Sequence, residues 1–133
     1  MARSLLVIDD DETDVMFLRE AFRSKGQAVD IRHAQSGDEG LAAMREAAPD
    51  LVLLDLKMPG TSGFEVLNAI RVDGALRRSK VIVFSSSQSR VDVREAYESA
   101  ANAYITKPSS MSGYLDVAQS LTDLWLGRVL SAD

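Results

Sequence analysis

The stretch Leu51-Val52-Leu53-Leu54-Asp55 places a carboxylate directly after four consecutive apolar residues. An unbroken apolar run of this length is typical of a strand covered on both faces, as the strands of a parallel sheet are. Comparable short apolar runs, often β-branched, occur at residues 5–8, 29–31, 81–84 and 103–105. The sequence therefore predicts five short strands.

The segments between these runs carry apolar residues at helical spacing. Ser36 and Ser62 stand where helix N-caps are expected, and Gly26 can end the first helix. Strand and helix alternate five times, which favours a doubly wound α/β domain with right-handed crossovers. The helical stripes are Val15, Leu18, Ala21 and Phe22; Leu41, Met44, Ala47 and Ala48; Phe64, Leu67 and Ile70; Val93, Ala96, Tyr97 and Ala100; and a last helix over about residues 112–129.

Length and composition exclude several classes of protein. The chain has 133 residues, no cysteine and one histidine, His33, so thiol chemistry and sites that need two imidazoles are excluded. A formal net charge of −5 argues against binding to nucleic-acid phosphates. The apolar runs are too short for a membrane span or a signal peptide, which predicts a cytoplasmic protein without membrane contact. We expect one domain over residues 1–133, with the fifth helix and tail at about 109–133.

Polar residues follow four of the predicted strands. The pair Asp9-Asp10 follows the first strand, Asp55 the third, Ser85 the fourth and Lys107 the fifth. In a doubly wound sheet the ligand site lies at the carboxyl ends of the strands. Clustered carboxylates must bind a cation or take up protons, and an all-oxygen ligand set favours Mg²⁺. Together with an ammonium and a hydroxyl, these groups can hold a phosphoryl group, which an aspartate can accept as an acyl phosphate.

The acidic run also has a simpler interpretation. Asp11 fits a helix N-cap, and Glu12 and Asp14 fit the first helical turn, where the helix dipole favours acids. Asp55 is more informative, because a charge at the end of a buried strand needs a partner. His33, near the end of the second strand, is interpreted as structural and not as a phosphotransfer site.

Four segments resemble the motifs of the receiver domain of two-component response regulators. They are Asp9-Asp10 and residues 53–60, 83–86 and 104–108, and the resemblance covers nearly the whole chain. It implies a flavodoxin-like fold, with five helices around a parallel sheet of strand order 2-1-3-4-5. It also implies a phosphoacceptor signalling protein and not an enzyme. Such a protein takes a phosphoryl group from a sensor histidine kinase, labels itself from small phosphodonors and loses the group slowly.

The resemblance assigns roles to individual residues. Asp55 would accept the phosphoryl group, and Lys107 would contact the phosphoryl oxygens. Mg²⁺ would be held by Asp10, Asp55 and the backbone carbonyl of Lys57, with Asp9 reaching the ion through water. Metal, lysine and phosphoacceptor would thus meet at one edge of the sheet.

The family pattern further implies a switch. The Ser85 hydroxyl would move to the phosphate and couple it to Tyr104, an aromatic residue that turns inward on activation. The Lys107–Pro108 peptide would be cis, as is usual in the family. Lys57 stands at a variable position whose side chain influences dephosphorylation, so its side chain either shields the acyl phosphate or points to solvent.

A narrower resemblance is to single-domain receivers that partner phytochrome-type sensor kinases. It rests on residues 102–108, on Leu76-Arg77-Arg78 and on Leu124-Trp125-Leu126. It implies a light-responsive kinase as partner. We expect no DNA-binding or enzymatic domain after the fifth helix, so the output would be a surface change that another molecule reads.

Residues Asp9-Asp10-Asp11-Glu12-Thr13 also fit the DxDxT pattern of haloacid-dehalogenase-like phosphatases, with Asp9 as nucleophile and Asp11 as acid. This alternative leaves Asp55 without a role, and no apolar strand with terminal acids follows Lys107. A flavin-binding flavodoxin-like protein is a third alternative. Its phosphate loop should carry hydrogen-bond donors, whereas the first loop here is acidic.

The predicted last helix is apolar over a wider arc than one buried stripe requires. We expect a homodimer through the fourth helix, fifth strand and fifth helix, tightened by the tail. The alternative is a tail that folds back on its own domain. The residues expected on the dimer or partner surface are Tyr114, Val117, Leu121, Leu124 and Trp125, and Leu126, Val129 and Leu130 extend the apolar arc.

Overall fold

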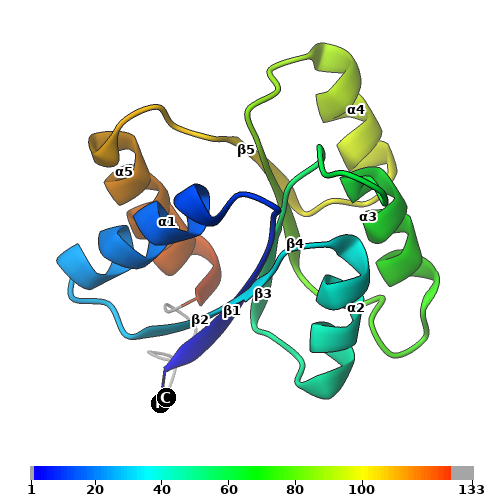
Figure 1. The fold of residues 1–133 in the computed structure, drawn as a ribbon, viewed down its shortest axis with the longest axis horizontal. Coiled ribbons are helices and arrows are strands. Elements are labelled where there is room, and N and C mark those ends of the chain that lie inside the picture. The colour runs from blue at the N-terminus through cyan, green and yellow to red at the C-terminus, as the bar shows by residue number, and fades with distance from the viewer. Residues whose placement is uncertain (1, 127–133) are drawn as a thin grey trace.

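The computed structural model describes residues 2–126, which form a five-stranded parallel sheet covered by helices on both faces (Figure 1). The strand order is β2-β1-β3-β4-β5, which confirms the predicted doubly wound fold. The strands are β1 (Arg3–Ile8), β2 (Val29–Ala34), β3 (Leu51–Leu54), β4 (Val81–Ser85) and β5 (Ala103–Thr106). The helices are α1 (Glu12–Ser24), α2 (Gly37–Glu46), α3 (Gly63–Val72), α4 (Arg90–Glu98), α5 (Met111–Leu121) and a π-helical turn η1 (Thr122–Leu126).

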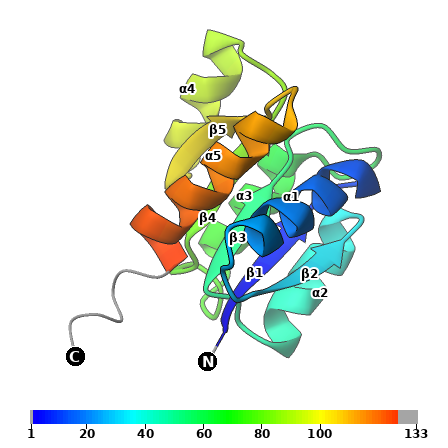
Figure 2. The same cartoon turned by 90° about the vertical axis from the view of Figure 1, so that its left-hand side faces the viewer.

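The central strands are buried because their alternate side chains enter two different cores. On one face, Leu53 and its neighbours pack with α1 and α5, which lie side by side (Figures 1 and 2). On the other face, Leu54 and its neighbours pack with α2, α3 and α4. All four residues of β3 are fully buried, as the apolar run predicts.

The helix boundaries follow the predicted signals. Ser36 accepts the backbone N–H of Glu39 at the start of α2, and Ser62 forms a capping box with Glu65 at the start of α3. Asp11 is the N-cap of α1, and Gly26 follows that helix with a φ of +68°, in the left-handed region. The three N-caps begin α1, α2 and α3 at the carboxyl edge of the sheet, where the candidate site lies, whereas Gly26 follows the end of α1 at the opposite edge.

Three expectations need correction. The Lys107–Pro108 peptide is trans, since residues 2–126 contain no cis peptide, and trans is the lower-energy isomer of such a bond. The α4 stripe is mostly not buried: Ala96 is buried, but Tyr97 is 50% exposed and Ala100 is exposed. The regular α-helix α5 ends at Leu121, well before the predicted end, and residues 127–129 of the predicted helix lie outside the described residues.

No helix among residues 2–126 combines the length and apolar character that a membrane span requires.

Gly63 is required where the α3 N-terminus meets the loop after β3. A Cβ atom there would lie 2.2 Å from the Asp55 carbonyl oxygen and 2.6 Å from the Leu56 Cα, and backbone atoms cannot move aside cheaply. We expect Gly63→Ala to lower the free energy of unfolding by about 1–3 kcal/mol, measured by urea denaturation. Gly74→Ala is the control, because nothing lies within 4 Å of its added carbon. Equal stability of the two variants would contradict this account.

Candidate functional site

Backbone hydrogen bonds align the strand ends that carry the site. The Asp9 N–H donates to the Ala34 carbonyl (3.0 Å), and the Asp55 N–H donates to the Ile8 carbonyl (2.9 Å). The Lys107 N–H donates to the Ser85 carbonyl (2.8 Å). These bonds extend the parallel pairing by one step beyond the strands. The structure thus brings the predicted residues Asp9, Asp55, Ser85 and Lys107 to one edge of the sheet.

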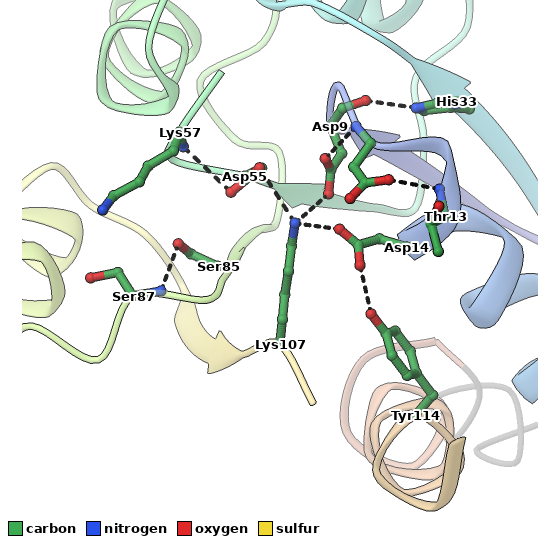
Figure 3. A network of polar contacts seen from close by, with 11 residues as sticks. Asp9, Thr13, Asp14, His33, Asp55, Lys57, Ser85, Ser87, Lys107 and Tyr114 are labelled. Carbon is green, nitrogen blue, oxygen red and sulfur yellow. Dashed lines mark hydrogen bonds and ion pairs between the residues drawn. The ribbon is translucent and has the colours of Figure 1, made fainter. Parts of the chain in front are cut away.

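The Lys107 ammonium group lies at the centre of the site (Figure 3). Its Nζ is 2.8 Å from Asp9 Oδ2, 2.5 Å from Asp14 Oδ2 and 3.4 Å from Asp55 Oδ2. Asp10 completes the acidic cluster: carboxylate oxygens of Asp9, Asp10 and Asp55 lie within 4.8 Å of one another. Asp10 is exposed, whereas Asp9 and Asp55 are buried.

The contact with Asp14 was not predicted from the sequence, which placed Asp14 in a solvated first turn. Its Oδ1 accepts a hydrogen bond from the Tyr114 hydroxyl (2.8 Å), so α1 and α5 both reach the site (Figure 3). A signal was present: residue 14 precedes Leu18 by four positions, on the apolar side of α1. An acid at that spacing points toward the sheet, where it needs a cationic partner.

Burial sets the electrostatics of the pocket. It raises the pKa of Asp9 to about 6, although Lys107 and the Asp11 N–H oppose the shift. It also raises the pKa of Asp55, against the opposing effect of Lys107 and the Lys57 N–H. Burial alone would lower the pKa of Lys107, but its close contacts with the Asp14 and Asp9 carboxylates raise it overall. Lys107 is therefore firmly cationic, while burial makes the charged forms of Asp9 and Asp55 less favourable than they are in water.

The acidic cluster fits a hard divalent cation. The ligand atoms of Asp9, Asp10 and Asp55 are all oxygens, which Mg²⁺ and Mn²⁺ prefer. The buried Asp9 Oδ2 has an ion pair with Lys107 but no donor in hydrogen-bond geometry among the described residues. A second cation would therefore satisfy an oxygen that the protein leaves incompletely bonded.

The loop between β4 and α4 links two of the predicted switch residues. The buried Ser85 hydroxyl oxygen accepts the Ser87 N–H (3.2 Å), and the Tyr104 hydroxyl donates to the Ser87 carbonyl (2.8 Å). Ser87 also donates from its hydroxyl to Asp92 of α4 (2.6 Å). Ser89 is the N-cap of α4. Sequence analysis assigned no role to Ser87.

Two further predicted residues border the pocket. His33 lies in β2 with its Nε2 2.7 Å from the Asp9 carbonyl oxygen, a contact that supports the loop after β1. The Lys57 backbone N–H lies 3.4 Å from Asp55 Oδ1, while its exposed side chain points away from Asp55 (Figure 3). This geometry matches the solvent-facing alternative for Lys57.

The predicted partner surface needs correction. Tyr114 is 3% exposed, Val117 8% and Leu121 0%, because α1, the sheet and η1 cover them. The wide apolar arc of α5 thus serves the chain's own core. Leu124 is 74% exposed and Trp125 is half-buried, and these two remain available to a partner. Leu126 is buried, and Val129 and Leu130 lie outside the described residues.

A parallel sheet that gathers carboxylates and one lysine at its carboxyl edge defines a phosphoacceptor type of signalling domain. The model of the response regulator receiver domain family matches residues 5–119, and the chain belongs to this family. It is a receiver domain of the two-component response regulators, as its motifs indicate. The phosphatase alternative is not supported, since the matched family accounts for most of the chain and the acidic run leads directly into α1.

Curated and solved relatives agree with this family. The chain is 31% identical to the polar-differentiation response regulator DivK of Brucella ovis over 120 residues, 90% of this chain and 96% of DivK. The phosphorylated cyanobacterial phytochrome response regulator RcpA superposes with a TM-score of 0.86 at 27% identity, covering 96% of this chain and all of RcpA. The Mn²⁺-bound form of response regulator Rcp1 superposes with a TM-score of 0.83 at 26% identity, covering 94% and 95% of the two chains.

Binding of Mg²⁺ to the acidic cluster can be tested through the stability of the protein. We expect Mg²⁺ at ten times its dissociation constant to raise the free energy of unfolding by about 1.4 kcal/mol, measured by denaturation with and without EDTA. Asp10→Asn removes one exposed carboxylate of the cluster and should reduce this gain. Asp11→Asn is the control, because asparagine caps a helix as well as aspartate and residue 11 lies outside the cluster. An equal gain in Asp10→Asn and the wild type would contradict the assignment.

Proposed function

We propose that Asp55 is the phosphoacceptor and takes its phosphoryl group from the phosphohistidine of a sensor histidine kinase. The observation that carries this proposal is the buried Asp55 carboxylate, which lies both in the acidic cluster and against Lys107. In the transfer, an Asp55 oxygen bonds to phosphorus. The P–N bond of the phosphohistidine breaks, and its electron pair stays on the imidazole nitrogen.

The residues around Asp55 would hold the phosphoryl group in two ways, through a bound Mg²⁺ ion and through Lys107. Asp10, Asp55 and the Lys57 carbonyl would ligate Mg²⁺, and Asp9 would reach the ion through water. When bound, Mg²⁺ offsets the negative charge that the phosphoryl group adds to the pocket. Lys107 binds a phosphoryl oxygen from the opposite side, which its present contact with Asp55 supports. We expect the domain to act as a signalling protein that loses its phosphoryl group slowly.

The switch proposal rests on the loop after β4. Ser85 binds the new phosphate, and this movement shifts Ser87, whose N–H and carbonyl now bond Ser85 and Tyr104 respectively. Because Ser87 also bonds Asp92, the shift reaches α4 directly. The surface of α4, β5 and α5 therefore changes when Asp55 is phosphorylated. Tyr104 turns inward once its hydroxyl loses the Ser87 carbonyl.

A phytochrome-like sensor kinase is the proposed partner. The similarity to the phytochrome response regulator RcpA supports this assignment, and so do the motifs at residues 102–108 and 124–126. Phosphotransfer tests it: a phytochrome-type kinase should transfer its phosphoryl group to this chain faster than an unrelated histidine kinase does. Equal rates from both kinases would remove the light-sensing assignment and leave the receiver function intact.

Phosphorylation at Asp55 is tested by incubation with Mg²⁺ and acetyl phosphate, followed by peptide mapping with mass spectrometry. We expect a labile phosphoryl group on Asp55 that is absent with EDTA and abolished in Asp55→Asn. Asp50→Asn is the control, because Asp50 lies at the opposite end of β3, where it pairs with Ser4. A covalent intermediate on Asp9, with turnover of phosphate esters, would overturn the assignment.

We further propose that the domain forms a homodimer through the surface of α4, β5 and α5. β5 is an edge strand whose residues are at least partly exposed. An apolar groove runs between β5 and the end of α5, with Ile105 and Leu121 in its wall and Leu124 and Trp125 at its rim. A second copy would cover this groove. The edge of a sheet and an exposed leucine beside it are features that a partner normally buries.

Sedimentation tests both the dimer and the switch. We expect a concentration-dependent dimer that tightens with a phosphoryl mimic and is lost in Leu124→Asp. Val72→Asp is the control, because Val72 is equally apolar, 83% exposed and on α3.

The same measurement tests the coupling between phosphorylation and the dimer. Lys107→Ala should still be phosphorylated, but its phosphorylated form should dimerise no more tightly than its unphosphorylated form. A monomer at high micromolar concentration, with and without the phosphoryl mimic, would contradict the dimer. Dimerisation of Lys107→Ala that tightens on phosphorylation as in the wild type would contradict the proposed role of Lys107 in the switch.

A further inference from the structure

Lys107 has its shortest contact with Asp14 and not with the phosphoacceptor. Its Nζ is 2.5 Å from Asp14 Oδ2 but 3.4 Å from Asp55 Oδ2. An ammonium has three N–H donors, and three carboxylates surround this one. Asp14 is not among the residues that form the acidic cation cluster. It therefore contacts the lysine of the pocket without joining its metal ligands.

Asp14 is itself held from the far side by α5. Its second oxygen accepts the Tyr114 hydroxyl at 2.8 Å. The Tyr114 ring is buried and packs against Phe84 at 6.2 Å and Phe17 at 5.3 Å between ring centroids, so the hydroxyl has a fixed position. The Asp14 and Lys107 side chains are only 14% and 12% exposed. This chain of contacts is nearly closed to solvent.

We propose that Asp14 and Tyr114 are a positioning pair that holds the Lys107 ammonium in place for the phosphoryl group on Asp55. The proposal rests on the phosphoacceptor function given above. When the phosphoryl group forms, one of its oxygens replaces the Asp55 oxygen as a partner of Lys107. The contact with Asp14 persists through this exchange. The Lys107 ammonium is therefore already oriented when the phosphoryl group arrives, so less conformational entropy is lost in reaching the transition state of the transfer.

The competing explanation is that Asp14 and Tyr114 only fasten α1 to α5, which pack together along the same face of the sheet. A purely structural role would lower stability without changing the rate of phosphorylation in the folded protein. A positioning role would slow phosphorylation while leaving Mg²⁺ affinity unchanged, because Asp14 lies outside the cation cluster. The two roles are therefore separable.

The first measurement is the rate of Asp55 phosphorylation by acetyl phosphate at saturating Mg²⁺, below the unfolding range of every variant. We expect Asp14→Asn to be about tenfold slower than the wild type, and Tyr114→Phe to be slower by a smaller factor. The Mg²⁺ dissociation constant, from calorimetry, should stay within about twofold. Asp11→Asn is the matched control, because it removes the same charge from the start of the same helix without touching Lys107.

The second measurement does not depend on phosphorylation. The chain has four lysines, Lys25, Lys57, Lys80 and Lys107, so ammonium signals of ε-¹⁵N-lysine can be assigned by substitution. We expect the Lys107 signal to be protected from exchange with water in the wild type and in Asp11→Asn, and to be lost in Asp14→Asn. Loss of this signal together with slow phosphorylation supports the positioning role.

Three results would overturn the inference. They are a wild-type rate in Asp14→Asn, an unchanged Lys107 signal in that variant, and a parallel fall in Mg²⁺ affinity. Failure of the phosphoacceptor function is distinguishable from all three, because the wild type itself would then carry no phosphoryl group on Asp55. The lysine signal would still decide whether Asp14 fixes Lys107.

Discussion

The Lys107 ammonium group balances carboxylates that three separate chain segments bring to one edge of the sheet. Asp9 follows β1, Asp14 belongs to α1 and Asp55 follows β3, and each contacts the same nitrogen atom. Without this cation the acids would repel one another more strongly and would have to bind a metal ion or take up protons. The backbone bonds beyond the strand ends matter for the same reason, since they bring β1, β3 and β5 into the register that lets one lysine reach all three acids.

The same balance makes the pocket responsive to charge. Burial already raises the pKa of Asp9 to about 6, and three carboxylates surround the one lysine. A phosphoryl group adds further negative charge, which the pocket can accept only by recruiting a cation and moving hydrogen-bond donors toward it. The donor proposed for this role is the buried Ser85 hydroxyl, which bonds Ser87, and Ser87 is bonded to both Tyr104 and α4. In the proposed switch, a change of charge at Asp55 would therefore reach the surface of α4 through the Ser85–Ser87 segment and its hydrogen bonds.

Sequence patterns predicted the fold and the strand-end residues because both depend on local chemistry. A buried strand such as β3 is recognisable from its own residues, and a carboxylate at its end is conspicuous. The partners of Lys107 were harder to predict. Asp14 lies 93 positions from Lys107 in the sequence, and Tyr114 lies 100 positions from Asp14. Only side-chain directions across packed helices reveal such contacts. Ser87 was missed for a related reason, since its backbone bonds Ser85 and Tyr104 while its hydroxyl bonds Asp92, and no local pattern shows these three contacts together.

The last helix illustrates a different limit of sequence analysis. Hydrophobic periodicity reports how wide the apolar arc is, but not what covers it. Here α5 lies between α1 and the sheet edge and continues into η1, so three surfaces of the same chain share its apolar side chains. Tyr114 adds a polar atom to this arc, and its hydroxyl has a partly buried acceptor in Asp14. A tyrosine on an apolar stripe is therefore ambiguous: it fits an interface, where water meets its hydroxyl, and equally a core that contains a buried acid. In this domain the acid also contacts Lys107, so the helix that first suggested a partner surface reaches the lysine of the acidic pocket through Tyr114 and Asp14.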